Sequence, residues 1–524
     1  MLRISFLVTS IFILNFTICF SQITESEVGK DGILFARYPD SIKPNNPKEG
    51  QCIYNTDLNC LECYDGNQWK SICSDSPNSS SPTTVYDQIQ SSAPGWMCLQ
   101  TANEYLAEFL RQNPDVSYWN QDHATQSIVA VGEPSISGAT ISISPTGADD
   151  TQLIENAISQ VGQGGVVEGG GATFLVDDLT INQAGVTLRN MNVKPFLNTD
   201  YRLILVSAVD VTFLRVHLDM ENKQFRLGIE VDHDGDRFAF VESSIKNFYN
   251  NSGFFGNMLR LFEGTDDVYI VNNEFVHSIG GANGSTSIRG IRVASSNIGS
   301  NPKGGIIASN LFEDFQTAAL DNHADAIVFQ SFDVDNQYQM GFRMAVLANE
   351  GINCGKSLLK AQSGGVDAHS NVNHWKDLNG ELGVRVTLAH YTNDGVSNCR
   401  WTNNLGISDQ LNPNSDSYFM VLTTDQFAGD LETDNVVMSC NKYVHNADTS
   451  NGKTSHAFTV HDWTAGTNGF NLPVMSNITN NVIEGQGTLR YVWWFRDVND
   501  STGSQFDHSQ NQITVNYQDL YNQD

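Results

Sequence analysis

A short phrase of apolar and polar positions returns along most of the chain. Each phrase has an apolar strand, then Asn or Ser, then a large apolar residue, as in VYIVNNEFV (268–276) and VVMSCNKYV (436–444). Alternation of this kind is typical of a half-buried strand. A strand phrase that returns every 20 to 50 residues, roughly, is typical of a solenoid. The pattern therefore predicts a chain wound into coils, each adding strands to parallel sheets.

Large apolar residues close most phrases and serve as anchors for counting. They are Ile245, Phe275, Phe312, Trp375, Trp401, Tyr443 and Ile483. The widest gap, between Phe312 and Trp375, predicts one more coil near Ile352. A β-sandwich also has alternating strands, but it does not repeat one phrase in this way, so we expect a parallel β-helix.

The start of the coiled region has its own signature. Gly147–Thr151 reads GADDT, residues 152–161 form a predicted helix, and residues 164–171 are rich in glycine. This order resembles the opening of the pectate-lyase-like superfamily of secreted polysaccharide-degrading proteins, in which a similar turn, helix and Gly-rich turn precede the first coils. The resemblance implies an all-β, right-handed, single-stranded parallel β-helix over residues 140–524.

The residues before the coils fall into four predicted segments. Residues 1–21 combine one Arg, a long apolar run and a small-x-small cleavage site at Cys19 and Ser21, which is typical of a signal peptide. We expect a small Cys-rich module at 22–73, a Ser/Pro linker at 74–84, and a helical or irregular lead-in at 85–139. The leader predicts a protein that is secreted, or held at the cell surface or in the periplasm. No other segment is apolar enough to span a membrane.

Four cysteines cluster in the N-terminal module: Cys52, Cys60, Cys63 and Cys73. Their spacing also suits zinc, but an exported protein favours disulfides. The surrounding segment, CIYNTDLNCLECYDGNQWKSIC, resembles a short module common at the start of exported proteins of the Bacteroidetes. We interpret it as a small spacer or adhesion unit.

The charge of the chain limits its partners. The 524 residues contain 29 Lys and Arg against 59 Asp and Glu, a formal net charge of -30. Such a balance argues against nucleic acid or an anionic membrane as the general partner. It leaves room for an anionic ligand in a local basic groove, and we expect a monomer.

Cations recur at equivalent places when positions are counted back from the anchors. Lys360, Arg260 and Glu230 each lie fifteen residues before an anchor, Arg385 lies sixteen before and Arg292 lies twenty before. In a solenoid, equal offsets indicate equal places on adjacent coils, so Lys360 and Arg385 are predicted to be stacked neighbours. The predicted column runs through Glu230, Arg260, Arg292, an unclear coil near Val328, Lys360 and Arg385.

The column is predicted to point away from the core. The residues beside each cation are apolar and face inward, and residues i and i+2 of a strand share a face, which adds Asp232 and Gln362 to the same surface. Charges along a sheet often only solvate it. However, like charges stacked about 5 Å apart repel unless an anion lies between them. We therefore expect an anionic polysaccharide as the partner of this surface.

One interpretation is a polysaccharide lyase. SLLKAQS and GVRVTLAH resemble in placement the Lys and Arg motifs that alginate-lyase and chondroitinase-B-like enzymes carry on successive coils. The resemblance implies β-elimination on a uronate-containing polymer, with Lys360 as the base and Arg385 binding the carboxylate. Sulfated polymers of marine origin are among the expected substrates. That family has two Glu that hold calcium before its Lys, whereas NEGINCG here supplies only Glu350.

Two other interpretations remain open. GIEVDHDGD places Glu230 and Asp232 on one strand face, about 7 Å apart along the strand, and two carboxylates are what glycoside hydrolysis requires. This pair is similar to one in iota-carrageenase β-helices, and the cations would then bind sulfate or uronate. The third interpretation is a carbohydrate-binding or adhesion protein without catalysis.

Histidines and aspartates supply further candidates. His323 lies between Asp321 and Asp325 just before a predicted strand, where carboxylates could hold one tautomer for acid catalysis. Calcium is a possible cofactor, held by Asp266 and Asp267 or by Asp232, Asp234 and Asp236, but Asp-rich turns more often close the backbone. The sequence predicts no certain cofactor and no defined metal site.

Overall fold

The computed structural model divides the chain into two compact units, Met1–Pro82 and Thr83–Asp524. The structure describes residues 28–29, 32–33, 37–38, 48, 52–55, 60–64, 69–71, 138–197, 201–262, 264–281, 287–294, 304–317, 324–330, 344–361, 366–376, 385–392, 399–409, 417–424, 436–447, 455–462, 478–496 and 510–523. The predicted signal peptide, the linker and residues 85–137 of the predicted lead-in lie outside these residues. The predicted domain boundaries remain predictions.

The first unit contains a small sheet. Its four strands, in spatial order, are β3 (Arg37–Tyr38), β4 (Cys52–Asn55), β5 (Cys60–Tyr64) and β6 (Trp69–Ser71). Two further strands, β1 (Val28–Gly29) and β2 (Gly32–Ile33), pair with each other. The backbone register places Cys52 opposite Cys63, and the expected disulfides remain a prediction.

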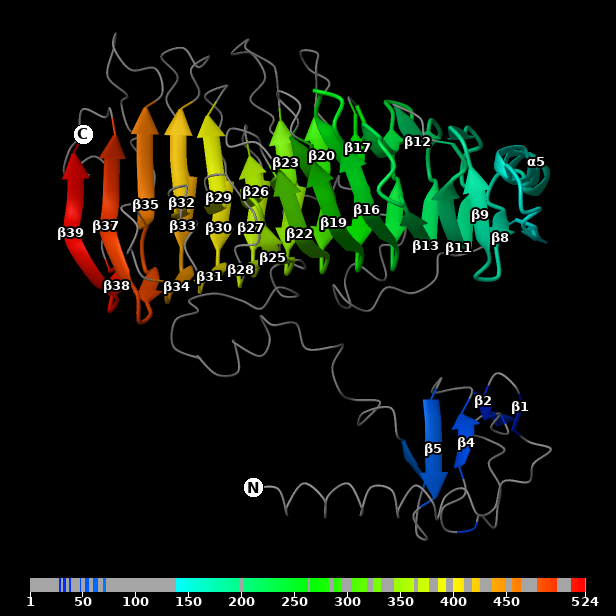
Figure 1. Cartoon of the computed structure of the whole chain (residues 1–524), viewed down its shortest axis with the longest axis horizontal. Helices are drawn as coiled ribbons and strands as arrows, with labels where there is room; N and C mark the ends of the chain where they lie inside the picture. The colour runs from blue at the N-terminus through cyan, green and yellow to red at the C-terminus, as the bar shows by residue number, and fades with distance from the viewer. Residues whose placement is uncertain are drawn as a thin grey trace. The chain divides into compact units, whose positions relative to one another are not determined.

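The second unit is a parallel β-helix, which confirms the predicted fold class. One sheet contains twelve strands, and every strand pairs in parallel with the strand of the next coil. They are β10 (Leu179–Ile181), β12 (Arg202–Val206), β14 (Leu227–Val231), β17 (Gly256–Leu261), β20 (Ile288–Ala294), β23 (Ala324–Gln330), β26 (Ser357–Ala361), β29 (Arg385–Thr392), β32 (Ser417–Thr424), β35 (Ser455–Asp462), β37 (Thr488–Arg496) and β39 (Asn516–Gln523). Figure 1 shows these strands side by side along the coils. We refer to them as the twelve-stranded sheet.

The remaining strands of the coils cover the other sides of the core. They are β7 (Thr140–Ser142), β8 (Val166–Glu168), β9 (Thr173–Val176), β11 (Thr187–Pro195), β13 (Thr212–Asp219), β15 (Ala239–Val241), β16 (Ser244–Asn250), β18 (Val268–Val271), β19 (Glu274–Gly280), β21 (Gly305–Ala308), β22 (Leu311–Thr317), β24 (Met344–Leu347), β25 (Glu350–Cys354), β27 (Val366–His369), β28 (Val372–Trp375), β30 (Cys399–Thr402), β31 (Leu405–Ser408), β33 (Val436–Ser439), β34 (Lys442–His445), β36 (Val482–Glu484) and β38 (Gln512–Ile513). The predicted coil near Ile352 is confirmed, because β25 pairs with β22 before it and β28 after it.

A helix lies at the N-terminal end of the coils. The helix α5 (Thr151–Val161) agrees with the predicted helix and buries Ile154, Ala157 and Ile158 against the first strands. The carboxylate of Asp150 fixes the turn before it by accepting hydrogen bonds from the backbone N–H and the hydroxyl group of Thr146. The apolar face of this helix therefore covers the end of the core.

The Asn or Ser of the recurring phrase forms an internal ladder. Its members are Ser243, Asn273, Asn310, Asn349, Asn371, Asn404, Asn441, Asn481 and Asn511. From Asn273 to Asn481, both the backbone N–H and the side-chain Nδ2 of each Asn donate to Oδ1 of the Asn in the next coil. A buried amide satisfied in this way is not penalised, which explains why the phrase repeats.

The anchors are equivalent only in part. Ile245, Phe275 and Phe312 stack in register through three coils. Trp375 and Trp401 are both buried in the core, but Trp375 pairs with Ser408, seven residues beyond Trp401. Treating the two tryptophans as equivalent was therefore wrong, because any large apolar side chain on an inward position can fill the core.

Candidate functional site

The predicted outward column is present on the twelve-stranded sheet as far as Lys360. Strand pairing aligns Glu230, Arg260, Arg292, Val328 and Lys360 on five successive strands. The residues on either side of them belong to the apolar core, so the column points outward, as expected from the alternation of a strand. The unclear coil near Val328 contributes an apolar residue. We call the three cations of this row the cation column.

The predicted place of Arg385 beside Lys360 is wrong. Strands β26 and β29 are neighbours, but Lys360 pairs with Ala389, and Arg385 pairs with Ser417 of the strand after it. Arg385 thus lies four residues before the row of Lys360, which is about 13 Å along a strand. The error arose from counting back from Trp401, which occupies a different place in its coil from Trp375.

A second outward row runs three residues before the first, because the strands bend. Met258 and Leu259 are consecutive and both belong to the core, so Asn257 and Arg260 on either side both point outward. The second row contains Arg202, Leu227, Asn257, Arg289, Asp325 and Ser357. On β20 the bend falls at Gly290, where a Cβ atom would lie 2.5 Å from the Ala326 carbonyl oxygen.

Arg289 is a residue that sequence reasoning missed. The bend brings it to the same outer face as Arg292, although a spacing of three would separate them in a regular strand. Its Nη1 donates a hydrogen bond of 3.0 Å to Oε1 of Gln330. The signal in the sequence was the IRGIR stretch, in which a glycine between two arginines marks a bulge.

The arginines are covered by aromatic rings and are nearly inaccessible. Arg289 is 3% exposed and Arg292 is 7% exposed. The guanidinium carbon of Arg289 lies 4.2 Å from the ring centre of Phe255, and that of Arg260 lies 4.1 Å from Phe262. These contacts replace water beside the cations by polarisable ring faces.

The positive charges of Arg260, Arg289 and Arg292, which we call the arginine cluster, repel one another. Burial, helped by the neighbouring charges of Arg289 and Arg260, lowers the pKa of Arg292 to about 8. Burial also lowers the pKa of Arg289 to about 10, although Asp325 on the next strand opposes that change. Within the described part of the chain, neither Arg289 nor Arg292 forms an ion pair with a carboxylate. The cluster therefore holds positive charge that the described residues do not neutralise.

Glu230 is held by two arginines at the start of the cation column. Its Oε2 accepts a hydrogen bond of 3.1 Å from Arg202, and its Oε1 lies 3.6 Å from Nη1 of Arg260. It is 7% exposed. With one carboxylate oxygen on each arginine, Glu230 is placed to hold Arg202 and Arg260 in position.

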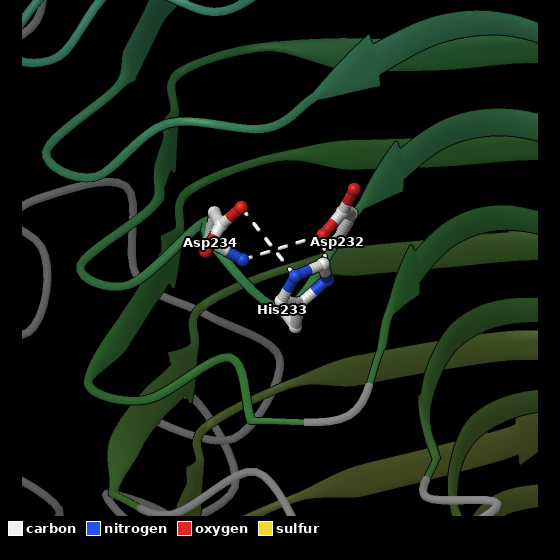
Figure 2. Close-up of side chains that lie close together, drawn as sticks. All are labelled: Asp232, His233 and Asp234. Atoms are coloured by element: carbon white, nitrogen blue, oxygen red, sulfur yellow. Dashed lines mark hydrogen bonds and ion pairs between the residues drawn. The ribbon is translucent and has the colours of Figure 1, made fainter.

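The side-chain contacts of Asp232 lie within its own turn. Figure 2 shows it beside His233 and Asp234, and one ligand atom from each of the three lies within 4.8 Å of the others. Asp232 contacts Nδ1 of His233 and accepts from the backbone N–H of Asp234. Asp236, the third predicted calcium ligand, instead accepts from the backbone N–H of Asp266. The contacts of Asp232 suit a closed turn, that of Asp236 joins two coils, and a calcium site remains a prediction.

The remaining predicted site residues differ in what is known of them. Lys360 is 7% exposed and lies between Val328 and Ala389 on the neighbouring strands. Asp325 accepts a hydrogen bond of 2.6 Å from Ser357. His323 and Gln362 lie outside the described residues, and their roles remain predictions.

A polar cleft of about 780 Å³ lies on another side of the coils, over β11, β13, β16 and β19. Its cations are paired with carboxylates, as in Lys246 with Glu274 and Lys194 with Glu221. Burial lowers the pKa of His217, which also lines the cleft, with the charge of Lys246 as a second cause. The lysines of this cleft are thus paired with carboxylates, unlike Arg289 and Arg292.

No family model and no curated protein matches the chain. Several solved structures resemble it. The surface adhesin PfbA of Streptococcus pneumoniae is 12% identical, with a TM-score of 0.37, over 72% of this chain and 90% of that one. The A-module of the mannuronan C-5 epimerase AlgE6 of Azotobacter vinelandii is 13% identical, with a TM-score of 0.39, over 71% and 96%. An alginate lyase bound to a trisaccharide is 11% identical, with a TM-score of 0.38, over 71% and 88%. At this level of similarity the function has to be argued from the site.

Among the described residues, no helix has the length and apolar character needed to cross a membrane.

Proposed function

We propose that the protein is secreted and depolymerises an anionic, uronate-containing polysaccharide by β-elimination. The observation that carries the proposal is the cation column, together with Arg289, on the outer face of consecutive coils. Among the described residues, neither Arg289 nor Arg292 is paired with a carboxylate, so these neighbouring cations repel each other, and an anionic polymer running along the coils would relieve that repulsion. A polymer also matches the repetition of the surface from one strand to the next.

Elimination needs a base and a group that stabilises the developing negative charge. The base removes the proton from the carbon beside the uronate carboxylate, and the glycosidic oxygen then leaves as a double bond forms. Lys360 is the proposed base, because a lysine is the only one of these cations whose neutral form is readily reached in proteins. Arg260 and Arg292 are proposed to bind acidic groups, since guanidinium forks match carboxylate and sulfate.

Arg385 and His323 keep separate proposed roles. Arg385 lies four residues from the row of Lys360, so we assign it to a different sugar unit from the one that reacts. His323 is proposed as the acid that protonates the leaving oxygen, and Gln362 as a further hydrogen-bonding group.

The proposal is tested by digesting a panel of anionic polysaccharides with the mature protein. The panel contains alginate, pectate, ulvan, chondroitin sulfate, carrageenans and sulfated fucan, and both reducing ends and the ultraviolet absorbance of unsaturated uronate are followed. We expect both signals to rise on at least one polymer. The Lys360→Met variant should lose a factor of about 100 or more in rate.

Lys246→Met is the matched control, because Lys246 lies on β16, away from the twelve-stranded sheet, and pairs with Glu274. It should retain the wild-type rate. Reducing ends that rise without absorbance would instead indicate hydrolysis and direct attention to Glu230 and Asp232. No signal on any polymer would favour a binding or adhesion protein.

A further inference from the structure

We infer that Arg289 and Arg292, with Arg260 beside them, form a subsite for a sulfate ester group of the saccharide. The inference deepens the proposed function by naming a second acidic group on the polymer. It rests on that function only for the polymer as the carrier of the sulfate.

The first argument is the surplus of hydrogen-bond donors. A guanidinium group has five N–H donors in a fixed plane. Within the described part of the chain, the buried Nε atoms of both Arg289 and Arg292 lack an acceptor. Gln330 accepts from Nη1 of Arg289, and no described acceptor is hydrogen-bonded to Arg292. Buried donors without acceptors are costly. The Nε atoms are covered, so an incoming anion would be bound through the Nη groups of Arg289 and Arg292 that no described residue accepts from.

The second argument is charge. Arg289 and Arg260 lie close enough to Arg292 for their charges to lower its pKa, and Arg260 acts on Arg289 in the same way. Of the residues that the structure describes, two carboxylates lie near them: Glu230 is held by Arg202 and Arg260, and Asp325 accepts from Ser357. The net charge that remains favours one further anion.

The third argument is the kind of anion. The ring of Phe255 lies 4.2 Å from the guanidinium carbon of Arg289 and 5.7 Å from that of Arg292, so the subsite is poor in water. A sulfate ester spreads one charge over three oxygens and loses less on dehydration than a carboxylate. A carboxylate can also bridge two arginines, as Glu230 does, but the three terminal oxygens of a sulfate ester offer two guanidinium groups more acceptor positions than the two oxygens of a carboxylate.

The subsite also has a defined relation to Lys360. Arg292 and Lys360 occupy the same row, two strands apart, with Val328 between them. Two strand spacings amount to about 10 Å, so the sulfate and the reacting uronate would belong to different sugar rings. A polymer that carries both uronate and sulfate is the expected substrate class.

The test compares two polymers of equal length and charge density, dextran sulfate and carboxymethyl dextran, at matched ionic strength. The mature wild-type protein should bind dextran sulfate about tenfold more tightly or better, since charge-assisted hydrogen bonds to two arginines are gained. The double variant Arg289→Met/Arg292→Met should lose this preference. Arg237→Met is the control, because Arg237 is paired with Asp210 outside the cluster, and it should keep the preference.

Equal affinity for the two polymers would overturn the inference, as would a sulfate preference that survives in the double variant. If the double variant does not fold, Arg289→Lys/Arg292→Lys replaces it, because lysine keeps the charge but loses the planar fork; a full preference in that variant would also overturn the inference. A sulfate preference without cleavage of any polymer would leave the subsite standing and remove the elimination chemistry. Cleavage that depends on Lys360 but shows no sulfate preference would support the elimination chemistry and overturn the sulfate subsite.

Discussion

Two stacks of polar side chains run along the same coils and have opposite properties. The asparagine ladder lies inside, and each of its amides from Asn273 to Asn481 hydrogen-bonds to the next coil. The cation column and Arg289 lie on the outer face of the twelve-stranded sheet, where Arg289 and Arg292 repel each other without an ion pair to a described carboxylate. The first stack completes its own hydrogen bonds, whereas Arg289 and Arg292 in the second have donors that no described residue uses.

This difference separates fold from function. A ladder of satisfied amides adds specificity to the register of the coils, because a shift by one residue would break every hydrogen bond in it. A cluster of unneutralised cations lowers the stability of the chain that carries it, and such groups are typical of sites that bind an anion. The comparison predicts opposite signs when the two stacks are mutated.

The largest expected effect comes from the ladder. Asn371→Ala removes the acceptor of the Asn349 backbone N–H and Nδ2, and the donor to the Val346 carbonyl oxygen. Since each orphaned buried group costs about 1–3 kcal/mol, the free energy of unfolding should fall by roughly 3–5 kcal/mol. Urea unfolding followed by circular dichroism measures it.

Asn373→Ala is the matched control for this ladder prediction. Asn373 is equally buried two residues later, but its side-chain nitrogen and oxygen have no hydrogen-bond partner among the described residues. Removing an unsatisfied amide should leave the free energy of unfolding nearly unchanged. Equal losses in Asn371→Ala and Asn373→Ala would show that side-chain volume, and not the ladder, sets the stability.

The second expected effect is a gain in the free energy of unfolding. Arg292→Met replaces an inaccessible, repelled cation beside Phe255 by an apolar side chain of similar length. The free energy of unfolding without ligand should stay the same or rise by about 1–4 kcal/mol, as seen when buried charges are replaced by apolar groups. Arg237→Met should instead lower it by about 1 kcal/mol or less, because a partly exposed ion pair with Asp210 is lost. A clear loss in Arg292→Met would place Arg292 among the structural residues.

The last effect depends on pH. Burial, with a further contribution from Arg400, lowers the pKa of His369 from 6.5 to about 3, and its Nδ1 lies 3.1 Å from the Thr402 carbonyl oxygen. The folded state favours the neutral ring, so this stabilisation is complete above pH 6.5 and is lost as the pH falls toward 3. Between pH 7 and pH 5, wild type should lose about 2 kcal/mol more than His369→Asn. Equal losses would show that His369 does not control acid stability.

The sequence predicted the repeated parts of the molecule better than the bent ones. The phrase that contains Asn273 and Asn441 located the coils, because every coil must place a satisfied amide at the same corner. Counting back from anchors placed Glu230, Arg260, Arg292 and Lys360 in one row, which strand pairing confirms.

Counting back from the anchors gives the wrong row where coils differ in length or where a strand bends. Trp401 is not equivalent to Trp375, so Arg385 was assigned to the wrong row. The bend at Gly290 places Arg289 and Arg292 on one face, although simple alternation separates them. Neither loop length nor a bulge leaves a periodic signal in the sequence.

The most direct test of the account is urea unfolding of wild type and Arg292→Met with and without dextran sulfate. A ligand that binds only the folded state raises its free energy of unfolding, and the increase grows with the affinity of the ligand. We expect the polyanion to raise the free energy of unfolding of wild type and to raise that of the variant much less. Without ligand, the variant should be at least as stable as wild type. A variant that is less stable alone and gains as much from the polyanion would contradict the claim that the outer arginines hold a ligand.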